Sequence, residues 1–344
     1  MDIQSAIATV IEQQHLSAEE MHEVMHSIMT GEATPSQIGG FLVGLRMKGE
    51  TVAEIAAAAS VMRELSSKVE LSNIDNIIDT CGTGGDGGKL FNVSTASSFV
   101  VAAAGGKVAK HGNRSVSSKS GSADLLEKAG VNLALSAEQV KTCVEEVGLG
   151  FMFAPNHHSA MKHAIVPRKE MAVRTIFNLL GPLTNPAGTK RQVMGVFDKK
   201  WVRPMAEVLQ RLGSEHVMVV HSQDGLDEIS LAAPTFVAEL KDNEIREYSI
   251  QPEDFNIETQ SIAPLQAENV EESLELVHGA LEGKGVVNPA RDIVALNAGA
   301  AIYVAGIADN LAEGVAIAED VIGGGLARVK LTELAAFTQC YLDN

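Results

Sequence analysis

The sequence contains few cysteines, and they are not arranged in pairs. Cys81, Cys143 and Cys340 are the three cysteines of the 344 residues, and they stand far apart without a Cys-x-x-Cys spacing. An odd and scattered set of thiols excludes a disulfide framework and a cysteine zinc site. We therefore expect the thiols to be reduced.

Long apolar runs are missing as well. No run reaches the roughly 20 residues that a membrane-spanning helix needs. The segment from Met1 to Leu16 carries acidic and polar residues where a signal peptide would carry basic ones. The content of 45% apolar and 21% charged residues is ordinary for a globular protein. We expect a cytoplasmic protein that does not act at a membrane.

Positive charge is scarce. Lys and Arg number 27 against 44 Asp and Glu, which gives a formal net charge of −17. This balance argues against a nucleic-acid partner, because binding to a phosphate backbone needs clustered cations. Two nucleotide-binding motifs are also absent, since there is no GxxxxGK[ST] P-loop and no GxGxxG opens a helix after a strand. An NTPase or a hydride-transfer enzyme is therefore not expected.

The segment from Asp79 to Asp124 has features of an anion site. The apolar run from Asn76 to Thr80 leads into a loop with glycine at positions 82, 84, 85, 87 and 88. Glycines let backbone N–H groups approach a ligand closely. Asn92, Ser94 and Thr95 then open an Ala/Val-rich helix, whose positive end faces the same loop. An oxyanion such as phosphate fits this arrangement.

The charges of this segment support the same interpretation. No acidic residue stands between Asp86 and Asp124, whereas five basic residues do: Lys89, Lys107, Lys110, Arg114 and Lys119. In so acidic a chain, a local positive patch predicts the binding of a small, highly charged anion. The alternative is a glycine-rich turn between a strand and a helix that binds nothing.

Three capping signals in succession predict that the N-terminal region is helical. The S/T-x-x-E/Q spacing of a capping box occurs at Ser17 with Glu20, at Thr34 with Gln37 and at Thr51 with Glu54. These signals predict four short helices without a strand between them: Ile3 to Gln13, Ala18 to Met29, Pro35 to Lys48 and Val52 to Leu65. Such helices form a small bundle or one half of an interface.

From Asn76 onward, strands and helices alternate. The predicted strands are Asn76 to Thr80, Lys107 to Ala109, Phe151 to Ala154, Gln192 to Phe197, His216 to His221 and Thr235 to Leu240. The predicted helices are Ser94 to Ala104, Ser122 to Lys128, Ala137 to Val147, Val202 to Leu212, Val270 to Leu281, Asp292 to Ala305 and Leu311 to Ile322. This alternation predicts an α/β fold with a mostly parallel sheet that helices cover on both faces.

The chain is expected to form two domains. Residues 1–70 make a small α-helical domain, and residues 71–344 make the large α/β domain. The segment from Pro155 to Pro186 interrupts the alternation of strands and helices, with chain reversals at Gly181-Pro182 and Asn185-Pro186. We expect it to run back to the N-terminal helices, so that residues from about 165 to 186 contribute to the helical domain and a hinge separates two lobes.

Several motifs of the chain resemble those of the anthranilate phosphoribosyltransferases of tryptophan biosynthesis. They are Gly82 to Asp86 (GTGGD), Asn92 to Thr95 (NVST), Lys110 to Arg114 (KHGNR), the SGSAD run that ends at Asp124, His157-His158 with Ala160-Met161, Arg174 to Pro186 (RTIFNLLGPLTNP) and Asp227-Glu228. The motifs cover almost the whole chain in order. The resemblance implies transfer of a phosphoribosyl group from phosphoribosyl pyrophosphate (PRPP) to the amine of anthranilate, with magnesium and loss of pyrophosphate. It also implies a homodimer that forms through the helical lobe.

The donor PRPP carries a pyrophosphate and a separate 5-phosphate, so its site needs many N–H donors and several cations. The residues predicted to contact the pyrophosphate and ribose are Gly82, Thr83, Gly84, Gly85 and Asp86. Those predicted to bind phosphate oxygens are Asn92, Ser94, Thr95, Lys110 and Ser122. Catalysis would then rest on positioning and charge stabilisation, without an assigned acid or base.

Two adjacent acids are the predicted magnesium ligands. Asp227 and Glu228 follow the strand from His216 to His221 at its carboxyl end, where such folds place ligands. Magnesium prefers carboxylates, waters and substrate phosphates. Adjacent acids in a loop are usually only solvated, but a pyrophosphate site nearby favours the metal. Ser94 is a further ligand by the resemblance.

The acceptor is an aromatic acid whose amine is uncharged at neutral pH, so the reaction does not demand a strong general base. By the resemblance, Arg168 is expected to bind the carboxylate of the acceptor. The other residues expected to line this pocket are Gly82, His111, Asn113 and His158. A zinc site of His157, His158 and His163 is the rival interpretation, but adjacent histidines point in different directions and no His-x-x-x-His pair is completed.

Two departures from the family's pattern lie near the acceptor side. Val166-Pro167-Arg168 stands where the family more often has Pro-Val-Arg, and Ala172 replaces a usual glycine. We expect them to affect the local backbone and not the reaction.

Two alternatives to this function are a pyrimidine nucleoside phosphorylase-like enzyme and a non-catalytic nucleic-acid-binding relative. The phosphorylase would be longer and would lack KHGNR and the Asp-Glu pair. The nucleic-acid-binding relative would be basic around its cleft and would lack the acceptor residues, whereas this chain is acidic and keeps Arg168, Asn113 and both carboxylates.

Overall fold

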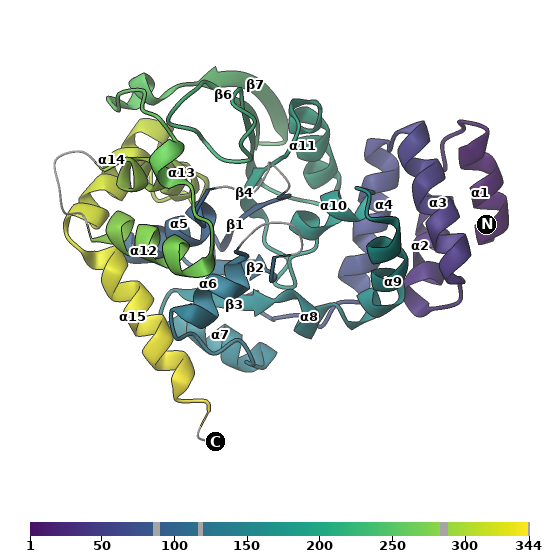
Figure 1. Cartoon of the computed structure of the whole chain (residues 1–344), viewed down its shortest axis with the longest axis horizontal. Helices are drawn as coiled ribbons and strands as arrows, with labels where there is room; N and C mark the ends of the chain where they lie inside the picture. The colour runs from purple at the N-terminus through teal and green to yellow at the C-terminus, as the bar shows by residue number, and fades with distance from the viewer. Residues whose placement is uncertain (85–89, 116–119, 283–287, 343–344) are drawn as a thin grey trace.

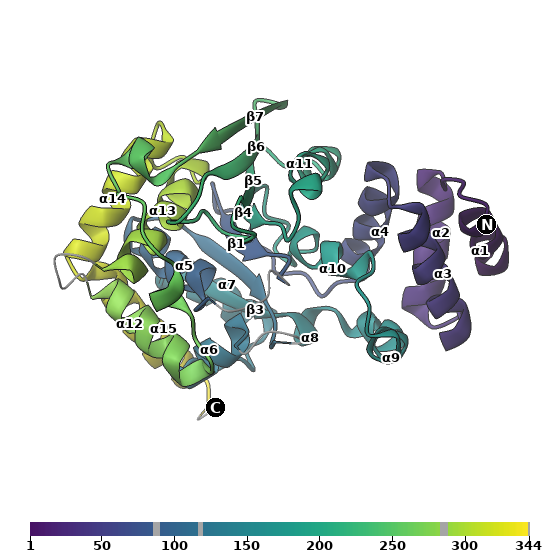
Figure 2. The ribbon, with the colours of Figure 1, turned by 45° about the horizontal axis from the view of Figure 1, so that its top comes forward.

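The computed structural model describes residues 1–84, 90–115, 120–282 and 288–342. A small helical lobe lies beside a larger lobe that is built on a sheet (Figure 1). The large lobe has strands in its middle layer and helices around them, as Figure 2 shows from a second side. The predicted fold class, a helical N-terminal domain followed by a mostly parallel α/β domain, is confirmed.

The helical lobe begins with four helices: α1 (Ile3–Ile11), α2 (Ala18–Thr30), α3 (Pro35–Lys48) and α4 (Val52–Glu64). All three predicted capping boxes are confirmed, since Ser17, Thr34 and Thr51 each accept a hydrogen bond from the N3 backbone while the N3 side chain binds back. Helix α1 ends two residues earlier than expected, because Gln13 has a left-handed φ of 59°.

A buried ion pair joins α3 to α4. The side chains of Lys48 and Glu54 are 1% and 0% exposed, with Nζ and Oε2 2.9 Å apart. Burial acts to raise the pKa of Glu54, but hydrogen bonds from the Leu16 backbone, Lys48 and Thr51 outweigh it and the net pKa is lowered. The carboxylate therefore stays ionised and fixes the turn between the two helices, together with the loop before α2.

The large lobe contains a seven-stranded sheet in the order β3-β2-β1-β4-β5-β6-β7. The strands are β1 (Ile78–Gly82), β2 (Val108–Gly112), β3 (Leu149–Phe153), β4 (Arg191–Gly195), β5 (His216–Ser222), β6 (Thr235–Lys241) and β7 (Glu244–Ile250). The first five in this order are parallel, and β6 and β7 add antiparallel strands at one edge. The six predicted strands all exist with shifted ends. Strand β7 was not predicted, because its sequence is largely polar and it forms an exposed edge.

Further helices lie around this sheet, and one of those that follow, α9 (Lys162–Met171), packs on the helical lobe instead. They are α5 (Val93–Ala103), α6 (Ser122–Lys128), α7 (Ala137–Glu146), α8 (Ala154–His157), α9 (Lys162–Met171), α10 (Phe177–Leu180), α11 (Val202–Arg211), α12 (Val270–Leu281), α13 (Pro289–Val304), α14 (Leu311–Gly323) and α15 (Leu326–Gln339). Short 3₁₀ turns occur at Ser159–Met161, Gly181–Leu183, Lys199–Trp201, Pro252–Phe255 and Ala263–Leu265. The sequence interpretation omitted α8, α9, α10 and α15. The last of these follows three glycines and has no side-chain N-cap, so its start carries no local signal.

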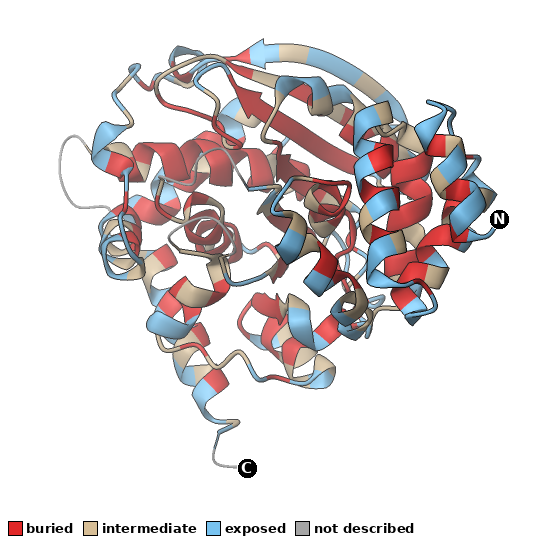
Figure 3. Ribbon diagram, turned by 45° about the vertical axis from the view of Figure 1, so that its right-hand side comes forward, coloured by how far each residue is buried: buried red, intermediate tan, exposed pale blue. Residues whose placement is uncertain are grey.

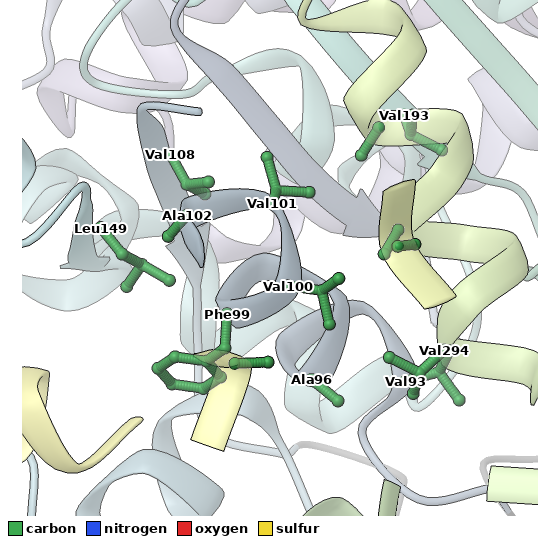
Figure 4. Packing of buried hydrophobic residues seen from close by; sticks show 14 of the residues in the cluster. Val93, Ala96, Phe99, Val100, Val101, Ala102, Val108, Leu149, Val193 and Val294 are labelled. Atoms are coloured by element: carbon green, nitrogen blue, oxygen red, sulfur yellow. The ribbon is translucent and has the colours of Figure 1, made fainter. Parts of the chain in front are cut away.

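Two hydrophobic cores lie on opposite faces of the sheet. Along β5, Met218 and Val220 belong to the core with α5 and α13, whereas Val217 and Val219 belong to the core with α11 and the helical lobe. Figure 4 shows the first core around Phe99 of α5. Burial continues through the middle of the sheet and along the inner faces of the N-terminal helices (Figure 3). Both faces of the sheet are thus covered, as predicted.

Several contacts join the lobes. After α4, the backbone N–H of Ser67 donates to the His157 carbonyl at 2.8 Å, and the His157 Nδ1 lies 2.8 Å from the Ser67 carbonyl. Arg63 donates from Nε to the Leu183 carbonyl at 2.6 Å. Helix α9 packs against α2 and α3, so this part of the chain does contact the N-terminal helices (Figure 1). No helix within the described ranges has the length and apolar character to span a membrane.

Candidate active site

The candidate residues gather where the parallel strands end. Because parallel strands point the same way, the carboxyl ends of β1, β2, β4 and β5 share one edge of the sheet. Helix α5 begins at this edge, and the Thr80 hydroxyl lies 3.1 Å from the Ser94 carbonyl in its first turn. The glycine loop follows β1, KHGNR ends β2, and the Asp-Glu pair follows β5. The sheet order therefore brings together three motifs that are far apart in the sequence.

Asp227 lies directly against the start of the glycine loop. Its Oδ2 accepts a hydrogen bond from the backbone N–H of Gly84 at 2.9 Å. A Cβ at Gly82 would stand 2.5 Å from the same oxygen, and a Cβ at Gly195 would collide with the Asp227 carbonyl. Glycine at these two strand ends is therefore required for the loop after β5 to reach β1. Gly85 and Asp86, which were also predicted to bind the donor, lie outside the described residues.

A buried cation and hydroxyl groups lie at the start of α5. Lys110 is 2% exposed, and its Nζ donates to the Thr80 carbonyl and lies 3.5 Å from the Ser94 Oγ. Burial lowers the pKa of Lys110, and the neighbouring Asp79 opposes this shift. The Thr95 Oγ1 is buried without a hydrogen-bond partner among the described residues. These groups provide one positive charge and several polar contacts for an anion at the helix N-terminus.

A small cavity lies between the start of α5 and the second acid of the pair. It is lined by Thr80, Cys81, Ser94, Ser97, Val193, Gly195, Val220, Glu228 and Asn297. Ser94 and Glu228, two of the three predicted metal ligands, therefore line the same cavity. The hydroxyl of Thr83, another predicted donor contact, accepts from the Phe197 backbone N–H at 3.0 Å and so also holds the loop against β4.

Buried polar contacts support the ends of β1 and β2. Asn185 donates from Nδ2 to the Asp79 Oδ2 at 2.8 Å and to the Ala109 carbonyl at 2.9 Å. The Asp79 Oδ1 accepts from the His111 backbone N–H at 3.3 Å. Burial raises the pKa of Asp79, against the effect of Lys110. The GPLTNP segment thus fixes the two strands that carry the glycine loop and KHGNR.

Two histidines predicted for the acceptor pocket meet face to edge. The ring centroids of His111 and His158 are 5.1 Å apart. Both Nε2 atoms are buried without a hydrogen-bond partner in the described part of the chain. Burial and the neighbouring histidines lower the pKa of His111 to about 3 and that of His158 to about 4. Both rings are therefore neutral at pH 7, and they can donate or accept hydrogen bonds without adding charge.

Arg168 approaches the same region from α9. Its guanidinium Cζ lies 5.0 Å above the ring centroid of Phe177, the first residue of α10. Helix α10 runs into the Gly181–Leu183 turn, and the Gly181 backbone acts to raise the pKa of His111 against the larger effect of burial. Arg168 is partly exposed, and no ion pair of its side chain occurs among the described residues. Arg168 is therefore a cation available to a carboxylate.

The remaining acceptor and donor predictions lie on the loop after β2. Asn113 is exposed, and its Oδ1 accepts from the Arg114 backbone N–H at 2.7 Å. Its carbonyl accepts from the Ser122 Oγ at 3.4 Å, at the first residue of α6. Of the departures from the family's pattern, Ala172 adopts the left-handed conformation, with φ 50°, where a glycine would be less strained.

The three histidines of the rival zinc interpretation face three different places. His157 contacts Ser67 in the linker, and His158 contacts His111. The ring of His163 covers Gly31, where a Cβ would stand 2.6 Å from its atoms. The structure therefore does not bring these side chains together as ligands of one metal ion.

The buried His158 should make stability depend on pH. Its pKa is near 4 in the folded protein against an ordinary value of 6.5, so the unfolded chain binds a proton first as the pH falls. Stability is then present above pH 6.5 and is lost as the pH falls towards 4. Between pH 7 and pH 5, the unfolding free energy of the wild type should fall by about 1–2 kcal/mol more than that of His158→Phe. Urea unfolding at both pH values measures this, and equal losses would contradict it.

Comparison with known proteins agrees with this geometry. A model of the glycosyl transferase family, a/b domain, matches residues 74–328, and one of the glycosyl transferase family, helical bundle domain, matches residues 4–66. An anthranilate phosphoribosyltransferase of Marinomonas sp. (strain MWYL1) is 75% identical over 343 residues, covering 100% of this chain and 99% of that protein. The chain belongs to the anthranilate phosphoribosyltransferase family.

Solved structures of the anthranilate phosphoribosyltransferase family share the whole fold. The enzyme of Thermus thermophilus is 43% identical with a TM-score of 0.91, and the match covers 97% of this chain and 99% of that one. The enzyme of Saccharomyces cerevisiae in complex with PRPP and Mg is 26% identical with a TM-score of 0.89, and 98% of each chain is covered.

Some residues that shape the site in this member of the anthranilate phosphoribosyltransferase family were not predicted. Gly195 admits the Asp227 loop, Asn185 was recognised only as part of a turn, and Ser273 of α12 contacts Asn92. A glycine at the end of a predicted strand is a weak signal of close backbone approach. The sequence holds no local signal for Ser273, because its partner is 181 residues away.

Proposed function

We propose that this protein transfers the phosphoribosyl group of PRPP to the amine of anthranilate, giving N-(5-phosphoribosyl)anthranilate and pyrophosphate. The observation that carries the proposal is the meeting, near one edge of the sheet, of a buried lysine with hydroxyl groups at the start of α5 and a pair of neutral histidines. Membership of the family, at 75% identity over the whole chain, supports the same reaction in tryptophan biosynthesis. The protein is then a glycosyltransferase of the pentosyl-transferring class.

The donor would bind between the glycine loop and the start of α5. The Gly84 backbone N–H donates to the carboxylate of Asp227, and Gly82 approaches the same carboxylate closely, where a metal-bound pyrophosphate is expected. The Thr83 N–H donates to the Gly195 carbonyl at 2.9 Å and so holds the loop in place. The phosphate oxygens are assigned to the polar groups around the α5 and α6 N-termini: Asn92, Ser94, Thr95, Lys110 and Ser122. The unpartnered Thr95 hydroxyl supports this assignment, because a buried hydroxyl without a hydrogen bond is costly. Gly85 and Asp86 stay predictions from the sequence.

Magnesium fits the donor set of this edge. Asp227 and Glu228 provide two carboxylates, and Ser94 provides a hydroxyl on the cavity that Glu228 lines. No cluster of three or more acidic, His or Cys side chains occurs in the described ranges. Such a sparse set suits magnesium, which is usually held by one or two carboxylates together with substrate phosphates. The yeast relative contains PRPP and Mg. Bound here, the ion would neutralise charge on the leaving pyrophosphate.

The acceptor would bind between the histidine pair and Arg168. The neutral rings of His111 and His158 offer polar contacts to the amine and flat surfaces to the aromatic ring. Because these rings carry no charge at pH 7, the carboxylate needs another partner, and the Arg168 guanidinium is assigned to it. Asn113 follows β2 and Gly82 is the last residue of β1, so both lie at the carboxyl ends of neighbouring strands.

The chemistry needs positioning more than proton transfer. The bond from ribose C1 to pyrophosphate breaks, a bond from C1 to the amine nitrogen forms, and the amine then releases a proton. The amine is already uncharged, so no residue is assigned as a general base. The role of the protein is to hold the two reactants together and to stabilise charge on the departing pyrophosphate.

Anthranilate fluorescence tests the proposed function directly. The signal of anthranilate should disappear when the protein, magnesium and PRPP are all present, and it should persist when any one of the three is left out. Pyrophosphate should appear in equal amount. Release of a free base from a pyrimidine nucleoside with inorganic phosphate, and no loss of anthranilate, would instead support the phosphorylase alternative. Binding of an oligonucleotide without turnover would support the nucleic-acid-binding alternative.

We also propose a homodimer formed through the helical lobe. Helix α3 packs against both α1 and α9, and exposed apolar side chains lie on all three helices. They are Ile11 at 61%, Val43 at 39%, Met47 at 76%, Ile165 at 42% and Val166 at 53% exposure. A cluster of exposed apolar groups indicates a surface that another protein covers. The proposed division into a helical domain of residues 1–70 with residues 165–186, and an α/β domain of residues 71–344, places this surface on the small lobe. A cytoplasmic location is proposed with it.

Met47→Glu should weaken this dimer. The change places a charge at the most exposed of these apolar residues, and we expect the dissociation constant to rise by about tenfold or more. Light scattering at micromolar concentration measures the assembly. Leu326→Glu is a matched control, because this apolar residue is 52% exposed on α15, in the other lobe. A wild-type protein that is monomeric and fully active would refute the dimer.

A further inference from the structure

Helix α12 supports the donor site from behind. It packs against α5, α6 and α13, and so it contacts both helices whose N-termini face the proposed phosphate groups. In Figures 1 and 2, α12 lies beside α6 in the large lobe. On the exposed side of this contact, Lys128 of α6 forms an ion pair with Glu271 of α12 at 2.6 Å. No residue of α12 belongs to the motifs that carry the resemblance to the family.

Ser273 of α12 is fully buried and binds Asn92 at two points. The Asn92 backbone N–H donates to the Ser273 Oγ at 3.1 Å, and the Ser273 hydroxyl donates to the Asn92 Oδ1 at 2.8 Å. One hydroxyl therefore serves as both acceptor and donor, which uses its hydrogen and one lone pair. Asn92 is the residue before α5, so this contact fixes the point where the donor-binding helix begins.

Asn92 also forms hydrogen bonds with Ser120, on the loop after β2. Its Oδ1 accepts from the Ser120 Oγ at 2.9 Å, and its Nδ2 donates to the Ser120 carbonyl at 3.2 Å. The Asn92 amide group is thus held from both sides, by Ser273 and by Ser120. This orientation leaves one N–H of the amide for a ligand, because in the described part of the chain the other N–H is the one that Ser120 accepts.

A purely local role for the Ser273 hydroxyl does not account for these contacts. Serine within a helix often returns its hydroxyl to the carbonyl four residues earlier, as Ser98 does to the Ser94 carbonyl at 2.9 Å in α5. The hydroxyl of Ser273 bonds instead to a residue of the donor site, 181 positions away. Alanine would fill the same buried position without a polar group to satisfy.

We propose that Ser273 is a positioning residue for PRPP, which acts by fixing the amide of Asn92 and, through it, Ser120. The proposal rests on the proposed function, since it names a further residue of that donor site. Without the Ser273 hydroxyl, the Asn92 amide can turn away from the orientation that presents its free N–H to a phosphate oxygen. The histidine pair and Arg168, which are assigned to the acceptor, are not among the described residues that form hydrogen bonds with Ser273, Asn92 and Ser120.

Kinetics of Ser273→Ala test this inference. We expect the KM for PRPP to rise by about tenfold, the size of one lost hydrogen bond to a charged group. The KM for anthranilate should stay within about twofold of the wild type. Thr338→Val is the matched control: the Thr338 hydroxyl is also buried, accepts from the Asn132 backbone N–H at 3.1 Å and donates to the Ala335 carbonyl at 3.0 Å, on α15. Its loss should leave both KM values unchanged, even where it lowers the melting temperature.

A double-mutant cycle separates positioning from general stability. If Ser273 acts through Asn92, then adding Ser273→Ala to Asn92→Ala should change the KM for PRPP by less than about twofold. Equal tenfold effects in both backgrounds, or an unchanged KM for PRPP in Ser273→Ala, would overturn the inference. A wild-type protein that neither binds PRPP with magnesium in calorimetry nor consumes anthranilate would refute the proposed function itself. The two failures are therefore distinguishable.

Discussion

Replacing Asp227 by Asn and Glu228 by Gln in one protein should lower turnover by roughly 100-fold or more, with the fold retained. The double variant removes two anionic ligands but hardly changes the shape of the side chains. The amide oxygen introduced by Asp227→Asn can still accept from the Gly84 N–H, as the Asp227 Oδ2 does at 2.9 Å. The loop after β5 should therefore stay in place, while magnesium loses the charges that hold it beside the pyrophosphate.

The measurement is the initial rate of anthranilate consumption as a function of magnesium concentration. The half-saturating magnesium concentration should rise in the double variant, and circular dichroism should show the same helix content as the wild type. Asp224→Asn is the matched control, because Asp224 is an exposed acid of the same loop that is not assigned to the metal. Normal turnover with normal magnesium dependence in the double variant would contradict the assignment of both carboxylates as magnesium ligands.

Arg168→Ala should raise the KM for anthranilate by about 10- to 150-fold, which corresponds to roughly 1.5–3 kcal/mol for a charge-assisted hydrogen bond. The KM for PRPP should stay within a few-fold of the wild-type value. The reason is that the only other positively charged candidate in the described site, Lys110, lies buried at the start of α5 and contacts Thr80 and Ser94. The histidine pair is neutral and cannot replace the lost cation.

Lys169→Ala provides the control for Arg168→Ala. Lys169 is the next residue of α9 and is exposed, so its loss removes a similar charge from the same helix without touching Phe177. It should change neither KM appreciably. If Arg168→Ala mainly raised the KM for PRPP, this arginine would belong to the donor site. Small changes in both KM values would show that it is a surface cation near the hinge.

Local signals in the sequence predicted much of this protein. The capping boxes at Ser17, Thr34 and Thr51 depend on residues three positions apart, and each formed as expected. The alternation of strands and helices predicted the mostly parallel sheet, and parallel strands require their carboxyl ends to share an edge. The motifs after β1, β2 and β5 therefore had to approach one another. Residue chemistry and chain order were sufficient for the fold class and for bringing these motifs to one edge of the sheet.

The contacts within the site depended on tertiary structure. Gly195 was needed because β4 is the neighbour of both β1 and β5, so that the Asp227 carbonyl passes over its end. Likewise, no spacing in the sequence predicts the contact of Ser273 with Asn92 or that of Asn185 with Asp79. These contacts form only when α12 and the GPLTNP turn pack in the folded protein. The sequence by itself determined the capped N-terminal helices, the six alternating strands and which motifs gather at the sheet edge, whereas β7, α8, α9, α10 and α15 carried no sufficient local signal. Only the packing of distant segments decided which polar groups form hydrogen bonds with each other. A hydrogen bond acts over about 3 Å and does not depend on the separation of its partners along the chain.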